Sequence, residues 1–131
     1  MKKYIIITLL ACLAMLHETY GQRQTGNPIE IGKWRFEQDM KSMWEFKING
    51  KVHKTYDGRN TNIIYSYTIS STPPVCPGAQ LAVKPNVDFL KLVNDKDGDI
   101  SCFYIYALNA ERLTVVDAIR GHIFPSVRVE E

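Results

Sequence analysis

The sequence lacks several features that would direct it to a particular class of protein. It contains no block of lysines and arginines, and its net charge of +2 at pH 7 gives no reason to expect nucleic acid as a partner. It has no internal repeat, no long low-complexity segment and no convincing helical periodicity. Its three cysteines show no Cys-x-x-Cys or His-Cys spacing, so no zinc or other metal site is predicted.

The one long apolar run lies at the N-terminus and is typical of a secretory signal peptide. Lys2 and Lys3 precede an apolar stretch that ends at Leu16, which is too short for a membrane-spanning helix of about 20 residues. The small residue Gly21 marks the expected cleavage site. We therefore expect an exported protein, periplasmic or extracellular, with a signal peptide over residues 1–21, a polar lead-in over 22–31 and a folded domain over 32–131.

The segment from Leu9 to Cys12 offers an alternative, because it loosely resembles a lipoprotein signal in which Cys12 would carry a lipid anchor. The apolar run continues past Cys12, and Leu10 is bulky for its place in such a signal. No second apolar run follows, so no transmembrane helix is expected after the leader.

Cys76 and Cys102 are the two cysteines outside the leader. An even pair of cysteines in an exported protein predicts a disulfide bond. A disulfide that closes a loop of about 25 residues would stabilise the fold by about 3 kcal/mol in the chain-entropy model.

Short alternating segments separated by turn residues at intervals of about ten residues predict a single all-β domain. The expected strands cover residues 32–36, 43–48, 51–56, 61–70, 80–83, 87–93, 100–108, 112–116 and 123–129. Asn49-Gly50 lies between two alternating segments and predicts a hairpin with a type I′ turn. This spacing is typical of an antiparallel sandwich or barrel.

The ends of this domain resemble the lipocalin-like family of exported proteins from Bacteroides-type bacteria. Gly32-Lys33-Trp34 opens the first strand as the Gly-x-Trp signature does in that family, and Arg128 stands in the last strand. The resemblance implies a small antiparallel up-and-down barrel or clam of about eight strands. It also implies that Arg128 lies over Trp34 and closes one end of the barrel, a contact worth about 0.5–2 kcal/mol. The domain is shorter than a typical lipocalin and leaves no room for the helix that usually follows the barrel.

Aromatic residues alternate along three of the expected strands and have two possible interpretations. They could line a ligand pocket, since tyrosine combines an apolar wall with a polar tip, or they could form an ordinary core. The candidate lining residues are Trp44, Phe46, Tyr65, Tyr67, Tyr104 and Tyr106.

No residue cluster predicts catalysis or a cofactor. Asp95, Asp97 and Asp99 resemble the start of a calcium loop, but Tyr106 stands where the last acidic ligand would be, so a hairpin turn is the better interpretation. No serine has the flanking glycines of a nucleophile elbow, and His53 stands alone. We therefore expect a protein that is not an enzyme.

Two functions remain as hypotheses. The first is a binding module that holds a small apolar or amphipathic ligand in the mouth of the barrel. The alternative is a protein-interaction or inhibitor module with a packed interior, which would use the loop of residues 71–78, from Ser71 to Gly78, as its contact surface.

Overall fold

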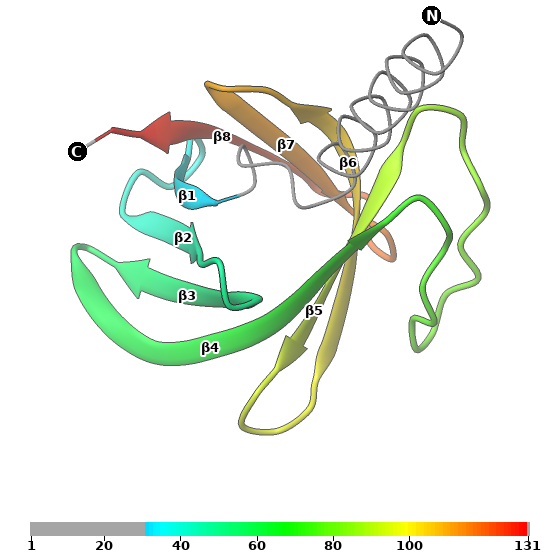
Figure 1. Cartoon of the computed structure of the whole chain (residues 1–131), viewed down its shortest axis with the longest axis horizontal. Coiled ribbons are helices and arrows are strands. Elements are labelled where there is room, and N and C mark those ends of the chain that lie inside the picture. The colour runs from blue at the N-terminus through cyan, green and yellow to red at the C-terminus, as the bar shows by residue number, and fades with distance from the viewer. Residues whose placement is uncertain (1–30, 131) are drawn as a thin grey trace, which may run out of the picture. The chain divides into compact units, whose positions relative to one another are not determined.

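The structure is a computed structural model that describes residues 31–130, and the expected signal peptide, the Cys12 anchor and most of the lead-in lie outside these residues. The predicted all-β fold is confirmed: the described chain forms a closed, antiparallel, up-and-down barrel of eight strands (Figure 1). The strands are β1 (Gly32–Phe36), β2 (Ser42–Phe46), β3 (Lys51–Tyr56), β4 (Arg59–Ser70), β5 (Asp88–Asn94), β6 (Ile100–Leu108), β7 (Arg112–Asp117) and β8 (Ile123–Val129). No helix within residues 31–130 is long and apolar enough to cross a membrane.

Each strand pairs with the next one along the chain, and β8 closes the barrel against β1 through pairs such as Trp34 with Arg128. Because successive strands run in opposite directions, the connections alternate between the two ends of the barrel. One end, called the mouth below, carries the connections at residues 37–41, 57–58, 95–99 and 118–122. The opposite end, called the closed end below, carries those at residues 47–50, 71–87 and 109–111.

Two turns differ from the sequence prediction in their geometry. The type I′ turn predicted at Asn49-Gly50 is wrong, because only Gly50 has a positive φ, at 80°. The Asn49 side chain instead accepts the Lys51 N–H, and the chain makes a three-residue loop that ends in a left-handed glycine. The type I′ geometry occurs at Asp57 and Gly58, whose φ angles are 53° and 73°.

The strand predicted over residues 80–83 is also wrong, because these residues have no regular structure. A closed barrel has no free edge to which an additional short strand could pair. Residues 71–87 instead form a long loop with one isolated bridge between Cys76 and Ala79.

This loop is fastened to the outside of the barrel at two points. The predicted disulfide between Cys76 and Cys102 is present, with both cysteines buried. Further along, the Lys84 ammonium lies 4.4 Å from the centre of the Tyr104 ring and 3.3 Å from the Tyr106 hydroxyl. The loop therefore lies along the outer face of β6.

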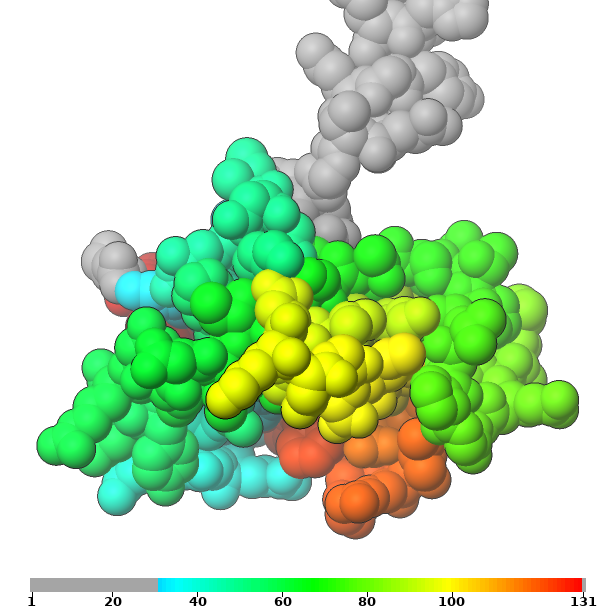
Figure 2. Space-filling model, turned by 90° about the horizontal axis from the view of Figure 1, so that it is seen from below, coloured from blue at the N-terminus to red at the C-terminus, as the bar shows by residue number. Residues whose placement is uncertain are grey.

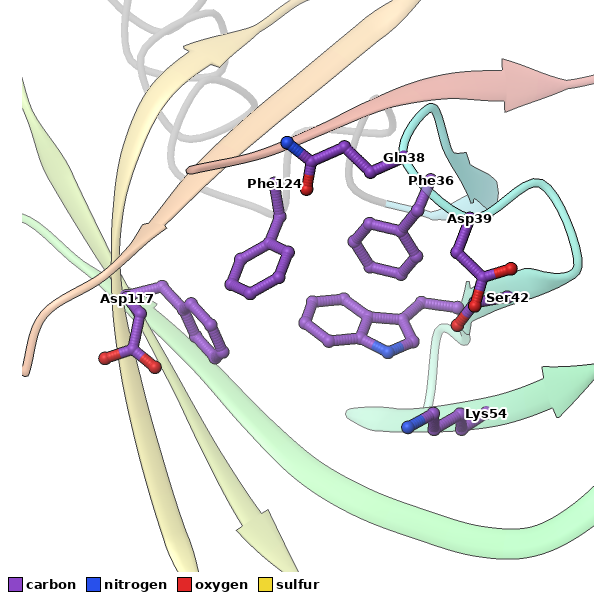
Figure 3. A pocket seen from close by; sticks show the side chains of 9 residues that line it. Phe36, Gln38, Asp39, Ser42, Lys54, Asp117 and Phe124 are labelled. Carbon is purple, nitrogen blue, oxygen red and sulfur yellow. The ribbon is translucent and has the colours of Figure 1, made fainter. Parts of the chain in front are cut away.

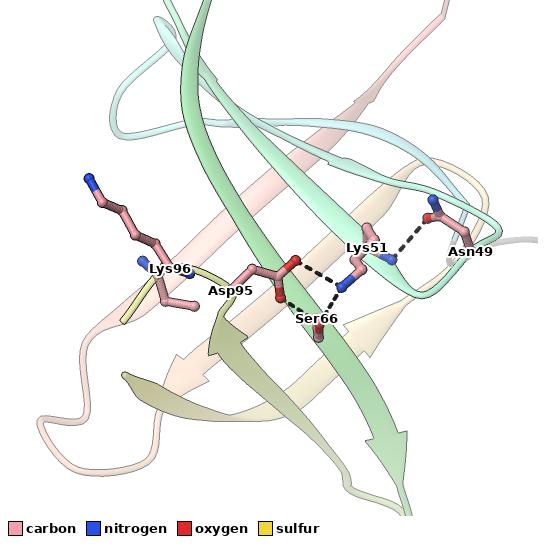
Figure 4. A network of polar contacts seen from close by, with 6 residues as sticks. Asn49, Lys51, Ser66, Asp95 and Lys96 are labelled. Atoms are coloured by element: carbon pink, nitrogen blue, oxygen red, sulfur yellow. Dashed lines mark hydrogen bonds and ion pairs between the residues drawn. The ribbon is translucent and has the colours of Figure 1, made fainter. Parts of the chain in front are cut away.

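A polar cluster on the outer surface ties the β5–β6 turn to β3 and β4 (Figure 4). Asp95 accepts hydrogen bonds from the Lys51 ammonium at 2.8 Å and from the Ser66 hydroxyl at 2.6 Å. Lys51 also donates to Ser66 at 2.8 Å. These hydrogen bonds, the one from Lys51 first, lower the pKa of Asp95 below its ordinary value.

This cluster predicts an acid-dependent contribution to stability. Because the folded-state pKa of Asp95 is lowered, its contribution is present above the unfolded pKa of about 3.9 and is lost as the pH falls through the folded value. Lys51→Met should therefore lower the urea midpoint at neutral pH, and the difference from the wild type should shrink as the pH falls below about 4. Lys96→Met, which changes an exposed lysine on the same turn, should have no such effect. A difference that does not depend on pH would contradict this account.

Candidate functional site

The closed end is sealed by a packed contact between its first and last strands. The Arg128 guanidinium lies 4.7 Å from the centre of the Trp34 ring and donates a hydrogen bond to the Ile31 carbonyl at 3.1 Å. Gly32 has a φ of 146°, and a Cβ at this position would lie 2.8 Å from Arg128 Nη1. Glycine is therefore favoured at position 32, because L residues rarely adopt this φ and a side chain would displace the end of the arginine that covers the indole.

The interior next to the closed end is filled by side chains. Residues that pair across neighbouring strands point to the same face of the sheet, and this register places alternate residues of each strand inside the barrel. The buried residues of this packed half are Trp34, Phe46, Val52, Leu90, Leu92, Ile105, Leu113 and Val115.

The interior at the mouth contains a cavity of about 300 Å³. Its lining residues are Phe36, Gln38, Asp39, Ser42, Trp44, Lys54, Phe103, Asp117 and Phe124 (Figure 3). In Figure 2 the cyan segment that includes the loop after β1 and the orange turn after β7 lie at the same lower edge of the molecule, with a hollow between them. The cavity thus opens between the connections of the mouth.

Four aromatic rings form a continuous wall of this cavity. Phe36 packs edge to face on Trp44 at 4.8 Å between ring centres, and Trp44 packs in the same way on Phe103 at 5.7 Å. Phe124 completes the circle, with its ring centre 6.4 Å from that of Phe103 and 6.2 Å from that of Phe36. These edge-to-face contacts hold the rings in place, so the wall exists before any ligand enters.

Three charged residues stand around this aromatic wall. Asp39 accepts the Lys41 backbone N–H at 3.3 Å, and Asp117 accepts the N–H groups of Ile119 and Arg120 at 2.8 and 2.9 Å. Both carboxylates therefore help to fix the connections of the mouth. Lys54, in contrast, is a half-buried residue whose ammonium has no hydrogen bond or ion pair with any part of the chain between residues 31 and 130.

The six aromatic residues predicted as a lining do not form one site. Trp44 lines the cavity. Phe46 and Tyr67 pack against each other at 5.0 Å, and the Tyr67 hydroxyl donates to the Lys47 carbonyl at the closed end. Tyr65 faces inward from β4 and is half-buried. Burial first, and then the nearby Asp97 and Asp99 carboxylates, raise the pKa of Tyr65 above its ordinary value.

Tyr104 and Tyr106 lie away from the cavity. Tyr104 pairs with Phe89 in the register of β5 and β6, whereas Phe103 pairs with the inward-facing Leu90. The two tyrosines therefore lie on the outer face, where Tyr106 remains 51 % exposed beside Lys84. The structure therefore places them apart from the cavity wall that includes Trp44, because the inner face of β6 carries Phe103 and Ile105.

Comparison with protein-family models, with curated proteins and with solved structures finds no match. The lipocalin-like resemblance therefore stays a prediction at the level of family, although the barrel itself is present. Within the described residues, no three histidine, cysteine or acidic side chains are grouped closely enough to hold a metal ion.

The loop named in the alternative hypothesis is exposed at its tip. Val75 is 83 % exposed, while the neighbouring Cys76 is held by the disulfide. The role of this loop in binding a protein partner stays a prediction.

Proposed function

We propose that this protein is an exported, lipocalin-like binding module, and not an enzyme, that holds a small apolar or amphipathic molecule in the mouth of its barrel. The observation that carries this proposal is the cavity of about 300 Å³ walled by Phe36, Trp44, Phe103 and Phe124. Among residues 31–130, buried side chains fill the interior next to the closed end, and this cavity lies in the other half of the barrel. The disulfide fits a function in an oxidising compartment, either the periplasm or the extracellular space.

Burial of apolar surface would drive the binding. Each 100 Å² of apolar ligand surface that leaves water contributes about 2.5 kcal/mol. A preformed aromatic wall reduces the ordering cost of association, because its side chains are already fixed by their mutual contacts. Polar groups at the rim would orient the ligand, as is usual in small-molecule pockets.

Native mass spectrometry of the protein purified from an exporting host tests this proposal. We expect a reproducible non-covalent extra mass that disappears on denaturation. Ser42→Trp should abolish it, because Ser42 lines the cavity and an indole there would fill the space. Thr68→Trp, which adds the same indole to the exposed outer face of β4, is the matched control and should keep the extra mass.

Two results would contradict the proposal. One is a bare protein mass for the wild type as well as for both variants. The other is an extra mass that survives in Ser42→Trp, which would place the bound molecule somewhere other than the mouth.

A further inference from the structure

The size of the cavity limits the occupant of the mouth to a compact molecule. A volume of about 300 Å³ equals the space of roughly ten water molecules at about 30 Å³ each. It lies at the lower end of the range of about 300–1,000 Å³ that is typical of small-molecule pockets. This space encloses on the order of ten non-hydrogen atoms, so a long acyl chain or a polycyclic molecule would extend out of the cavity into solvent.

The wall of the cavity favours a ligand that contains an aromatic ring. Phe36, Trp44, Phe103 and Phe124 already pack edge to face, at ring-centre distances between 4.8 and 6.4 Å. Aromatic rings prefer partners at such angles, because the positive edge of one ring meets the negative face of another. A ligand with a ring of its own would extend this arrangement into the open volume.

The ammonium of Lys54 favours an anionic head group on its side of the cavity. Lys54 lines the cavity from β3, on a different side of the aromatic wall from Asp117 (Figure 3). The acceptor oxygens of Asp39 and Asp117 that hold the mouth connections already receive backbone N–H groups. Lys54 is half-buried and has three donor hydrogens that no side chain or carbonyl of residues 31–130 accepts. A carboxylate near Lys54 would supply the acceptor that this ammonium lacks.

We propose that the ligand is a compact aromatic carboxylate, with its ring against the four-ring wall and its carboxylate paired with Lys54. This inference rests on the proposed function of the mouth. It specifies three properties of the ligand, which are its compact size, its aromatic ring and its negative charge.

Calorimetric titration with matched probes tests these three specifications. The probes are 3-phenylpropionate, 3-phenylpropan-1-ol, 3-phenylpropylamine and palmitate. We expect 3-phenylpropionate to bind about tenfold or more tightly than the alcohol, as a charge-assisted hydrogen bond implies. Lys54→Met should remove this preference, so that the carboxylate loses about tenfold or more of its affinity relative to the alcohol. Lys91→Met, which replaces a half-buried lysine on the outer face of β5, should leave all affinities unchanged.

The outcomes separate this inference from the proposed function. Tighter binding of the amine, or equal binding of carboxylate and alcohol, would overturn the anionic head group and leave the mouth as a binding site. Tighter binding of palmitate would overturn the compact ligand. A Lys54→Met variant that weakens the alcohol as strongly as the carboxylate would show a structural role for Lys54 instead of a pairing role. If no probe binds to the wild type while native mass spectrometry still shows an extra mass that Ser42→Trp removes, the compact aromatic carboxylate is overturned and the mouth remains a binding site.

Discussion

Trp34→Ala is expected to lower the free energy of unfolding by about 3–5 kcal/mol, the usual cost of removing a fully buried tryptophan. Trp34 is 0 % exposed and packs inside the closed end, so its removal leaves a space that the neighbouring strands cannot fill without leaving their register. The variant also loses the contact with the Arg128 guanidinium. Urea denaturation followed by circular dichroism measures the change, and Trp34→Phe provides a milder variant if the alanine form does not fold.

Trp44→Ala is the matched control for this prediction. Trp44 is 9 % exposed and borders the cavity, so part of its surface has no protein neighbour to lose. Its replacement should therefore cost clearly less stability than that of Trp34. Equal losses for the two tryptophans would contradict the division of the interior into a packed half and an open mouth.

The double variant Cys76→Ala/Cys102→Ala is expected to lose about 3 kcal/mol of stability under oxidising conditions. The two residues are 26 positions apart, and the bond between them restricts the unfolded chain as well as holding the loop of residues 71–87 on β6. Urea denaturation measures the loss, and limited proteolysis should show faster cleavage within this loop.

The same measurement in reductant provides the control for the disulfide. Wild-type protein that has been unfolded and reduced should approach the stability of the double variant, while the double variant itself should not respond to reductant. A loss below about 1 kcal/mol would contradict the prediction and would mean that packing alone holds the loop.

Strand positions were the part of the fold that local sequence predicted well. Residues 32–36, 51–56, 100–108 and 123–129 form strands with the expected bounds, because period-two alternation and turn residues define them locally. The segment over residues 80–83 was misjudged, since pairing depends on a partner that local sequence does not reveal. The Asn49-Gly50 pair predicts a type I′ turn, but that turn forms at Asp57-Gly58, which is an equally favourable pair.

The prediction of the cavity lining depended on which side chains of β6 point into the barrel. Alternation along β6 separates two sets of side chains but does not say which set faces inward. The sequence nevertheless contained a signal, because Tyr104 and Tyr106 share a face with Cys102. A cysteine bonded to a long loop points to the outside of a barrel whose inside is packed, so Phe103 was the better candidate for the lining.

Three of the polar lining residues lie in segments for which the sequence predicts connections and not strands. Gln38 and Asp39 lie in the loop after β1, and Asp117 ends β7. These three side chains line the same cavity because the closed barrel places every second connection at the same end. This proximity depends on the whole topology of the barrel. The alternation of aromatic residues therefore predicts Trp44 as a lining residue but does not predict the other residues that line the cavity.

The most direct test of a ligand site in the mouth uses the two tryptophans of the sequence as reporters. With 5-fluorotryptophan incorporated, fluorine NMR gives one signal from Trp44 in the cavity wall and one from Trp34 at the closed end, assigned through Trp44→Phe. On titration with a panel of small aromatic and aliphatic compounds, we predict that at least one compound shifts the Trp44 signal saturably and leaves the Trp34 signal in place. A Trp44 signal that no compound moves, or two signals that always move together, would contradict a ligand site in the mouth.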